Sequence, residues 1–218
     1  MNLTNQMLSK IGEFFPLQVQ NPDEVKRMKV SGMTFDISTY RVEGLGHVSG
    51  IIASGFFGLM KTDTLIINPT ERDLPLFSYD RVHALGNDTL IYELYDTLLG
   101  SADLAGLEAV KARYANLPDH DLGQHWYDGI KLAVSLSKKG KRAHSSAVDS
   151  CTMDCLEAYL DSAENAPWCD PAGKKAKAAV YVEGLLEHGG PSTDVFKKGL
   201  GPEKTALLFR HVLFGTER

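Results

Sequence analysis

Apolar residues near the start of the chain recur at helical spacing. They predict an amphipathic helix over residues 3–15, which Pro16 ends because proline cannot continue a helix. From Val30 to Tyr40 the period changes to two, with apolar and polar residues alternating as in a half-buried strand. The first forty residues therefore predict one helix followed by a strand.

Further strand-like runs follow at short intervals, separated by turn residues such as Gly44, Gly46 and Gly86. Because parallel neighbours need long crossovers, the short connections favour an antiparallel sheet. Strands are expected over residues 48–54, 56–60, 65–67, 74–77, 81–85 and 89–95.

The second half of the chain is mainly helical in pattern. A short helix is expected to start at Ser192 or Thr193 and to end before Gly199. Residues 130–136 suit a strand or a short helix, and residues 138–142 predict a basic turn. The longer helices are expected over residues 104–114, 146–162, 172–186 and 202–214.

A strand meander followed by helices is an α+β arrangement. We therefore predict a three-layer α/β/α sandwich with a central antiparallel sheet. With no repeat, linker or low-complexity tract, residues 1–218 are expected to form a single domain.

Composition excludes several classes. The net charge of −5 gives no indication of a nucleic-acid partner. No stretch approaches the roughly 20 apolar residues of a membrane span, and the N-terminus lacks the pattern of a signal peptide, so we expect a cytoplasmic protein. Cys151, Cys155 and Cys169 lack a metal-ligand spacing and are expected to be reduced thiols.

The common cofactor motifs are also missing from the sequence. It contains no phosphate loop, no G-x-G-x-x-G at a strand–helix junction, no H-E-x-x-H and no G-x-S-x-G. We therefore expect no bound cofactor and no metal, so any redox chemistry must arrive with a partner or the substrate.

Three segments carry a resemblance to a known family. They are residues 65–80, with the L-P-L-F-x-x-D element at 74–80; residues 117–160; and TDVFKKGLGPEKTALLFRHVLF at 193–214. In order and spacing they resemble the ferredoxin-dependent bilin reductase superfamily, which includes red chlorophyll catabolite reductase. Residues 35–56 are similar to the early strands of the chlorophyll catabolite branch.

The resemblance implies that an open-chain tetrapyrrole lies between the sheet and the C-terminal helices, and that ferredoxin supplies electrons one at a time. An added electron makes a pyrrolic nitrogen or carbonyl oxygen more basic, and a carboxylic acid in an apolar pocket can then protonate it. Asp80 matches the family's catalytic aspartate, and Asn68 matches a position that faces the same substrate. Alternatively, Asp80 caps a hairpin and Asn68 starts an Asn-Pro turn.

Further acids and bases match the family less closely. The glutamate of the phycocyanobilin-forming members would fall near residues 51–54, where no acid stands. The aspartate that many members carry before the terminal short helix falls near Gly190, so His188 and Asp194 are the candidates for a second proton donor. Alternatively, His188 interacts with the dipole at the end of a helix.

Other residues are candidates for contact with the substrate or a partner. Three residues are expected to contact the pigment: His47, Trp126 and Arg210. Alternatively, His47 lies on the surface, Trp126 packs in the core, and Arg210 lies on a solvated helix face. Lys174, Lys175 and Lys177 are expected on an exposed helix face. A landing patch for an acidic ferredoxin, or else solvated basic surface, is predicted from Lys138, Lys139, Lys141, Arg142, Lys197, Lys198 and Lys204.

Three functions follow from this reading. The first is ferredoxin-dependent reduction of a bilin or chlorophyll catabolite, with Asp80 as proton donor. The second is a non-catalytic tetrapyrrole-binding or carrier protein of the same fold. The third is an α+β protein with no role in tetrapyrrole chemistry.

Overall fold

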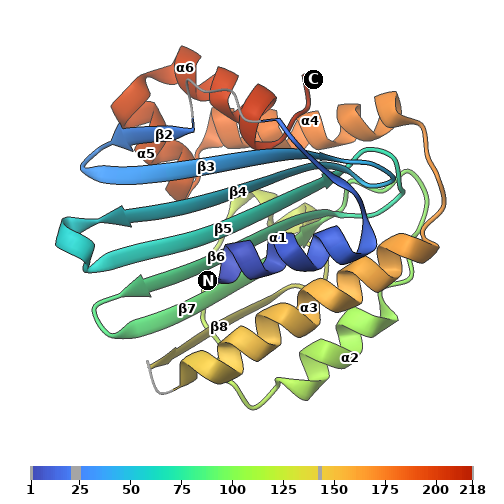
Figure 1. Ribbon diagram of the computed structural model, residues 1–218, viewed down its shortest axis with the longest axis horizontal. Helices are drawn as coiled ribbons and strands as arrows, with labels where there is room; N and C mark the ends of the chain where they lie inside the picture. Colours follow the sequence, from blue (N-terminus) through green and yellow to red (C-terminus); the bar gives the residue numbers. More distant parts are fainter. Residues whose placement is uncertain (1, 21–25, 142–143, 218) are drawn as a thin grey trace.

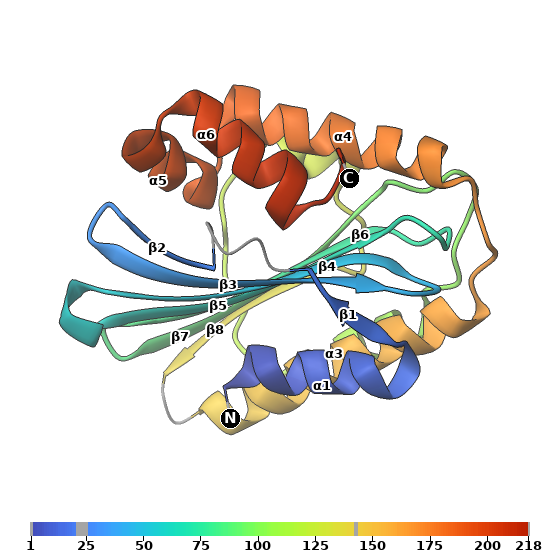
Figure 2. The same ribbon diagram turned by 45° about the horizontal axis from the view of Figure 1, so that its top comes forward.

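The computed structural model describes residues 2–20, 26–141 and 144–217. A twisted sheet forms the central layer, with helices on both of its faces (Figures 1 and 2). The predicted α+β class, with a large antiparallel sheet between helical layers, is confirmed. None of the described helices is both long enough and apolar enough to cross a membrane.

The sheet is antiparallel throughout, in the order β1-β3-β4-β5-β6-β7-β8, with β2 paired to β3. Consecutive strands are neighbours from β3 to β7, as the short connections predicted. The strands are β1 (Leu17–Val19), β2 (Arg27–Val30), β3 (Met33–Val42), β4 (Gly46–Gly55), β5 (Met60–Pro69), β6 (Leu76–Ala84), β7 (Asn87–Tyr95) and β8 (Leu136–Lys141).

Two helical layers bury the two faces of this sheet (Figure 2). One layer consists of α1 (Leu3–Phe14), α2 (Ala105–Arg113) and α3 (Ser145–Asn165). The other consists of α4 (Pro171–His188), α5 (Pro191–Leu200), α6 (Pro202–Leu207) and η4 (Leu208–Leu213), a stretch of π-helix. The described residues also form the 3₁₀ turns η1 (Phe56–Gly58) and η2 (Trp126–Ile130).

Alternation along each strand divides the side chains between two cores. On β7, Leu90, Tyr92 and Leu94 face α3, whereas Tyr95 faces α4 and η4. Because both faces are covered, nearly every residue of this strand's second half is buried.

The structure corrects several local predictions. Residues 56–59 are not a strand, because Phe56 and Phe57 have φ of 52° and 56° and form η1 between β4 and β5, which begins at Met60. The prediction of a basic turn at 138–142 is wrong for residues 138–141, because residues 136–141 form strand β8 and pair with β7. Residue 142 lies outside the described residues. The expected final helix 202–214 changes to π-helix at Leu208.

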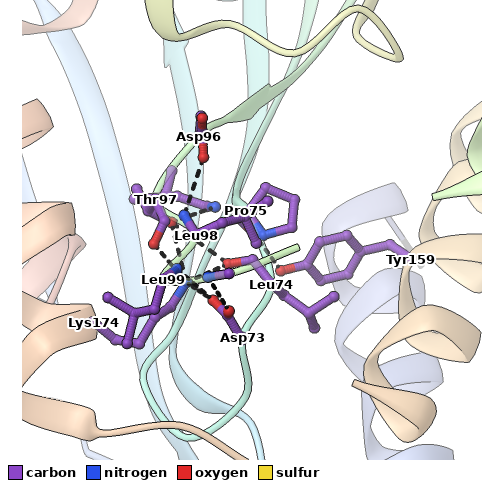
Figure 3. Close-up of polar contacts among 11 residues, drawn as sticks. Asp73, Leu74, Pro75, Asp96, Thr97, Leu98, Leu99, Tyr159 and Lys174 are labelled. Atoms are coloured by element: carbon purple, nitrogen blue, oxygen red, sulfur yellow. Dashed lines mark hydrogen bonds and ion pairs between the residues drawn. The ribbon is translucent and has the colours of Figure 1, made fainter. Parts of the chain in front are cut away.

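Lys174 is buried rather than exposed, and it connects α4 to two loops at the end of the sheet (Figure 3). Its Nζ donates to the carbonyl oxygens of Leu74 at 2.6 Å and Thr97 at 2.8 Å, and lies 3.4 Å from Asp73 Oδ1. Burial lowers the pKa of Lys174, and the Asp73 carboxylate opposes that shift. The opposite helical layer reaches the same loop through Tyr159 Oη, which donates to the Pro75 carbonyl at 2.8 Å.

Substitution Lys174→Met tests this junction. We expect it to lower the free energy of unfolding by about 3 kcal/mol, because it leaves the Asp73 carboxylate buried without its cation. Lys177→Met, an exposed position on the same helix, is the control and should change stability by less than about 0.5 kcal/mol. Urea denaturation followed by circular dichroism measures both, and equal stabilities for the two variants would contradict the assignment.

Candidate functional site

A cavity of about 270 Å³ lies between the sheet and α4, α5 and η4. Most of its lining is apolar or aromatic, which is typical of sites for small organic ligands. The polar side chains that the strands contribute to it are Thr62, Thr64, Ser78, Asp80 and Glu93.

Strand register brings the two carboxyl groups together. Thr64 lies beside Asp80, and Ser78 lies beside Glu93 on the neighbouring strand. Asp80 and Glu93 therefore occupy adjacent rows on the same face of the sheet, which places them diagonally across the β6–β7 pair. The floor of the cavity thus carries two acids within an otherwise apolar surface.

Asp80 is held in a partly buried position, where Thr64 Oγ1 donates a hydrogen bond to its Oδ1. Burial raises the pKa of Asp80 to about 6, the Thr64 hydrogen bond opposes this shift, and the negative charge of Glu93 adds to it. A carboxyl group with this pKa holds its proton well above the usual range of aspartate, so it can act as an acid.

Glu93 is the site residue that the sequence analysis missed. Its side chain is 7% exposed, Tyr95 Oη donates to its Oε2 at 2.5 Å, and Lys131 Nζ lies 3.4 Å from its Oε1. The available signal was an acid at an inward-facing position of an apolar strand, where burial of an unpaired charge is costly.

Aromatic rings form one wall of the cavity. Tyr181 of α4 stacks on Tyr95 with ring centroids 4.2 Å apart, and Tyr127 meets Tyr95 edge-on at 5.5 Å. His125 stacks on Tyr127 at 4.9 Å. Trp126 does not line the cavity and is 38% exposed. Its Nε1 donates a hydrogen bond to the Gly189 carbonyl at 3.1 Å. These ring faces suit a flat conjugated ligand.

Three polar side chains of β4 and β5 fix the helical wall to the sheet. His47 Nε2, Ser49 Oγ and Asn68 Nδ2 donate to the carbonyl oxygens of Val212, Leu213 and Phe214 at 2.8, 2.8 and 2.7 Å. All three side chains are buried. We call this trio the carbonyl clamp. His47 and Asn68, which were expected to contact a substrate, hold the end of η4 in the ligand-free protein, and neither lines the cavity.

The remaining candidate acids and cations lie outside the cavity. His188, at the end of α4, lies beside the Trp126 ring at 5.5 Å, and Asp194 is exposed on α5. Arg210 forms a bidentate pair with Glu183, both contacts at 2.7 Å. None of the three lines the cavity, whereas Gly190 does.

The predicted basic patch does not form as one surface. Lys138 is buried on β8 and donates to Leu117 O at 3.1 Å and Asp119 Oδ1 at 2.7 Å, so its place on that patch was wrong. Lys139 and Lys141 are exposed on β8, at the sheet edge opposite the β1 and β2 end. Lys197 and Lys198 lie on α5, which contacts β2 (Figure 1). Arg142 lies outside the described residues.

The raised pKa of Asp80 predicts a dependence of stability on pH. Between about pH 4 and 6 the folded protein holds a proton that the unfolded chain releases, so stability falls as pH rises through that window. Asp80→Asn removes this ionisation. We expect it to raise the free energy of unfolding by about 3 kcal/mol at pH 8 and by less than about 1 kcal/mol at pH 4.

Thermal unfolding at the two pH values measures this difference. Asp161→Asn, a substitution at an exposed position of α3, is the control. Its stability should differ from that of the wild type by the same amount at both pH values. A gain for Asp80→Asn that is independent of pH would contradict the raised pKa.

The sequence matches no protein-family model and no curated protein. Among solved structures, the fold is similar to that of phytochromobilin synthase from tomato, crystallised in complex with biliverdin. The TM-score is 0.80 at 14% sequence identity, and the match covers 98% of this chain and 82% of that chain. The chain therefore has the fold of the ferredoxin-dependent bilin reductases.

Proposed function

We propose that this protein is a ferredoxin-dependent oxidoreductase that reduces an open-chain tetrapyrrole, a bilin or chlorophyll catabolite. The observation that carries the proposal is the position of Asp80, an acid of raised pKa on the floor of an apolar cavity with aromatic walls. The biliverdin bound to the tomato enzyme of the same fold supports a tetrapyrrole as the ligand.

The chemistry requires two electrons and two protons for each double bond reduced. The donor supplies the electrons singly, and each addition raises the basicity of a ring nitrogen or carbonyl oxygen. Asp80 donates its carboxyl proton to that atom, while Thr64 holds the carboxyl group in place. Solvent protons then restore the acid, and the cycle repeats for the second electron.

The electron donor is proposed to be an acidic protein of the ferredoxin type, and the proposal assigns no bound redox group to this chain. Lys197 and Lys198 lie on α5, and other residues of this helix, Thr193 and Phe196 among them, line the cavity. A donor attracted to these cations would approach the pigment across a single helix.

A carrier of the same fold is the second candidate. It is favoured by the position of His188 and Asp194, which lie outside the cavity and leave Asp80 without the expected second donor. A carrier binds the pigment and never reduces it, so turnover distinguishes the two functions.

A biliverdin titration followed by reduced ferredoxin without oxygen tests the proposal. The wild type should shift the pigment's visible spectrum and then bleach it. Asp80→Asn should bind the pigment and bleach it about 100-fold more slowly, because the amide has no proton to donate. Asp63→Asn alters a half-buried carboxyl group on the opposite face of β5 and should leave the rate unchanged. Binding without bleaching in the wild type would indicate a carrier.

The rate of bleaching should also depend on pH. Because Asp80 acts in its protonated form, the rate at limiting pigment, which reports on the ligand-free protein, should decline with one-proton dependence above about pH 6. Single-turnover kinetics from pH 5 to 9 measure this profile. A rate that stays constant across that range would exclude Asp80 as the acid.

A further inference from the structure

Glu93 has an oxygen with no hydrogen-bond donor. Oε2 accepts from Tyr95, but among the described residues no N–H or O–H group donates to the buried Oε1. Lys131 Nζ, at 3.4 Å, forms an ion pair with it without completing a hydrogen bond. An unsatisfied buried acceptor destabilises the folded protein, so its presence in a residue that lines the cavity points to a donor from outside the chain.

The surroundings of Glu93 limit what that donor can be. The groups that face it are Asp80 on β6, Tyr95 on β7, Tyr127 and His125 at η2, Tyr181 on α4, and Lys131 after η2. The apolar and aromatic lining suits a flat molecule that carries its own N–H groups. Pyrrole and lactam N–H groups of an open-chain tetrapyrrole meet both conditions.

We propose that Glu93 is a second substrate-binding carboxyl group, whose Oε1 accepts hydrogen bonds from the N–H groups of the tetrapyrrole. The inference rests on the proposed function, since it takes the tetrapyrrole as the ligand. The two acids then have different roles. Glu93 accepts hydrogen bonds from the N–H groups of the pigment and holds it, and Asp80 donates the proton. The raised pKa of Asp80 is consistent with this division, because Glu93 contributes to that shift.

Glu93→Gln tests both parts, since it keeps the shape of the side chain and removes the charge. We expect the Kd for biliverdin to rise about tenfold, because an amide is a weaker acceptor than a carboxylate. The pKa of Asp80, followed by carbon NMR of the ligand-free protein, should fall below its wild-type value because the neighbouring negative charge is gone. Asp80→Asn identifies the resonance.

Two further variants separate ligand contact from a structural role. Glu93→Asp keeps the charge and withdraws the oxygens by one methylene, so it should weaken binding while leaving the Asp80 titration in place. It also serves if Glu93→Gln fails to fold. Lys131→Met removes only the cation and should leave binding of biliverdin within about twofold. If Glu93 acts only as the counter-ion of Lys131, Glu93→Gln and Lys131→Met should change the Kd for biliverdin equally.

The outcomes are distinguishable from a failure of the proposed function. Wild-type protein that binds no biliverdin overturns the proposed function and, with it, the ligand contact of Glu93. Wild-type protein that binds and bleaches the pigment, beside a Glu93→Gln variant with unchanged Kd and unchanged Asp80 titration, overturns this inference alone.

Discussion

The cavity exists because the helical layer above it is fixed to the sheet by polar contacts at one end. The carbonyl clamp takes three consecutive carbonyl groups at the end of η4, groups that a helix leaves without intrahelical partners. With these groups satisfied in the interior, the backbone of η4 can be buried against the sheet at low cost. On β6 and β7 of the same sheet face, Asp80 and Glu93 face the open space between the layers.

This arrangement places satisfied and unsatisfied polar groups in neighbouring rows of one sheet face. Asn68 donates to the Phe214 carbonyl, whereas Glu93 retains an oxygen without a donor and Asp80 has a raised pKa. Keeping two carboxyl groups close together in an apolar cavity lowers the stability of the folded state. Such a cost is common where a site is prepared for a ligand, and it gives the cavity its chemical character.

Regular alternation and short turns were sufficient to predict the antiparallel meander and its helical cover, because these depend on local pattern. Asp80 was identified through a resemblance, and the structure places it on the cavity floor; its role as proton donor stays a prediction. The sequence did not reveal the buried positions of three polar residues, Lys174, Lys138 and Asn68. Their hydrogen-bond partners are Leu74, Leu117 and Phe214, which lie 21 to 146 residues away in sequence. Glu93 was missed because only the register of β6 against β7 places it beside Asp80.

A crystal structure of the complex with biliverdin would test the central claim most directly. The account predicts that the pigment lies flat between the sheet and η4, with a ring nitrogen or carbonyl oxygen within hydrogen-bond distance of the Asp80 carboxyl group and N–H groups directed at Glu93 Oε1. A pigment bound elsewhere on the protein, or one lying in the cavity with both carboxyl groups more than one water molecule away, would contradict it.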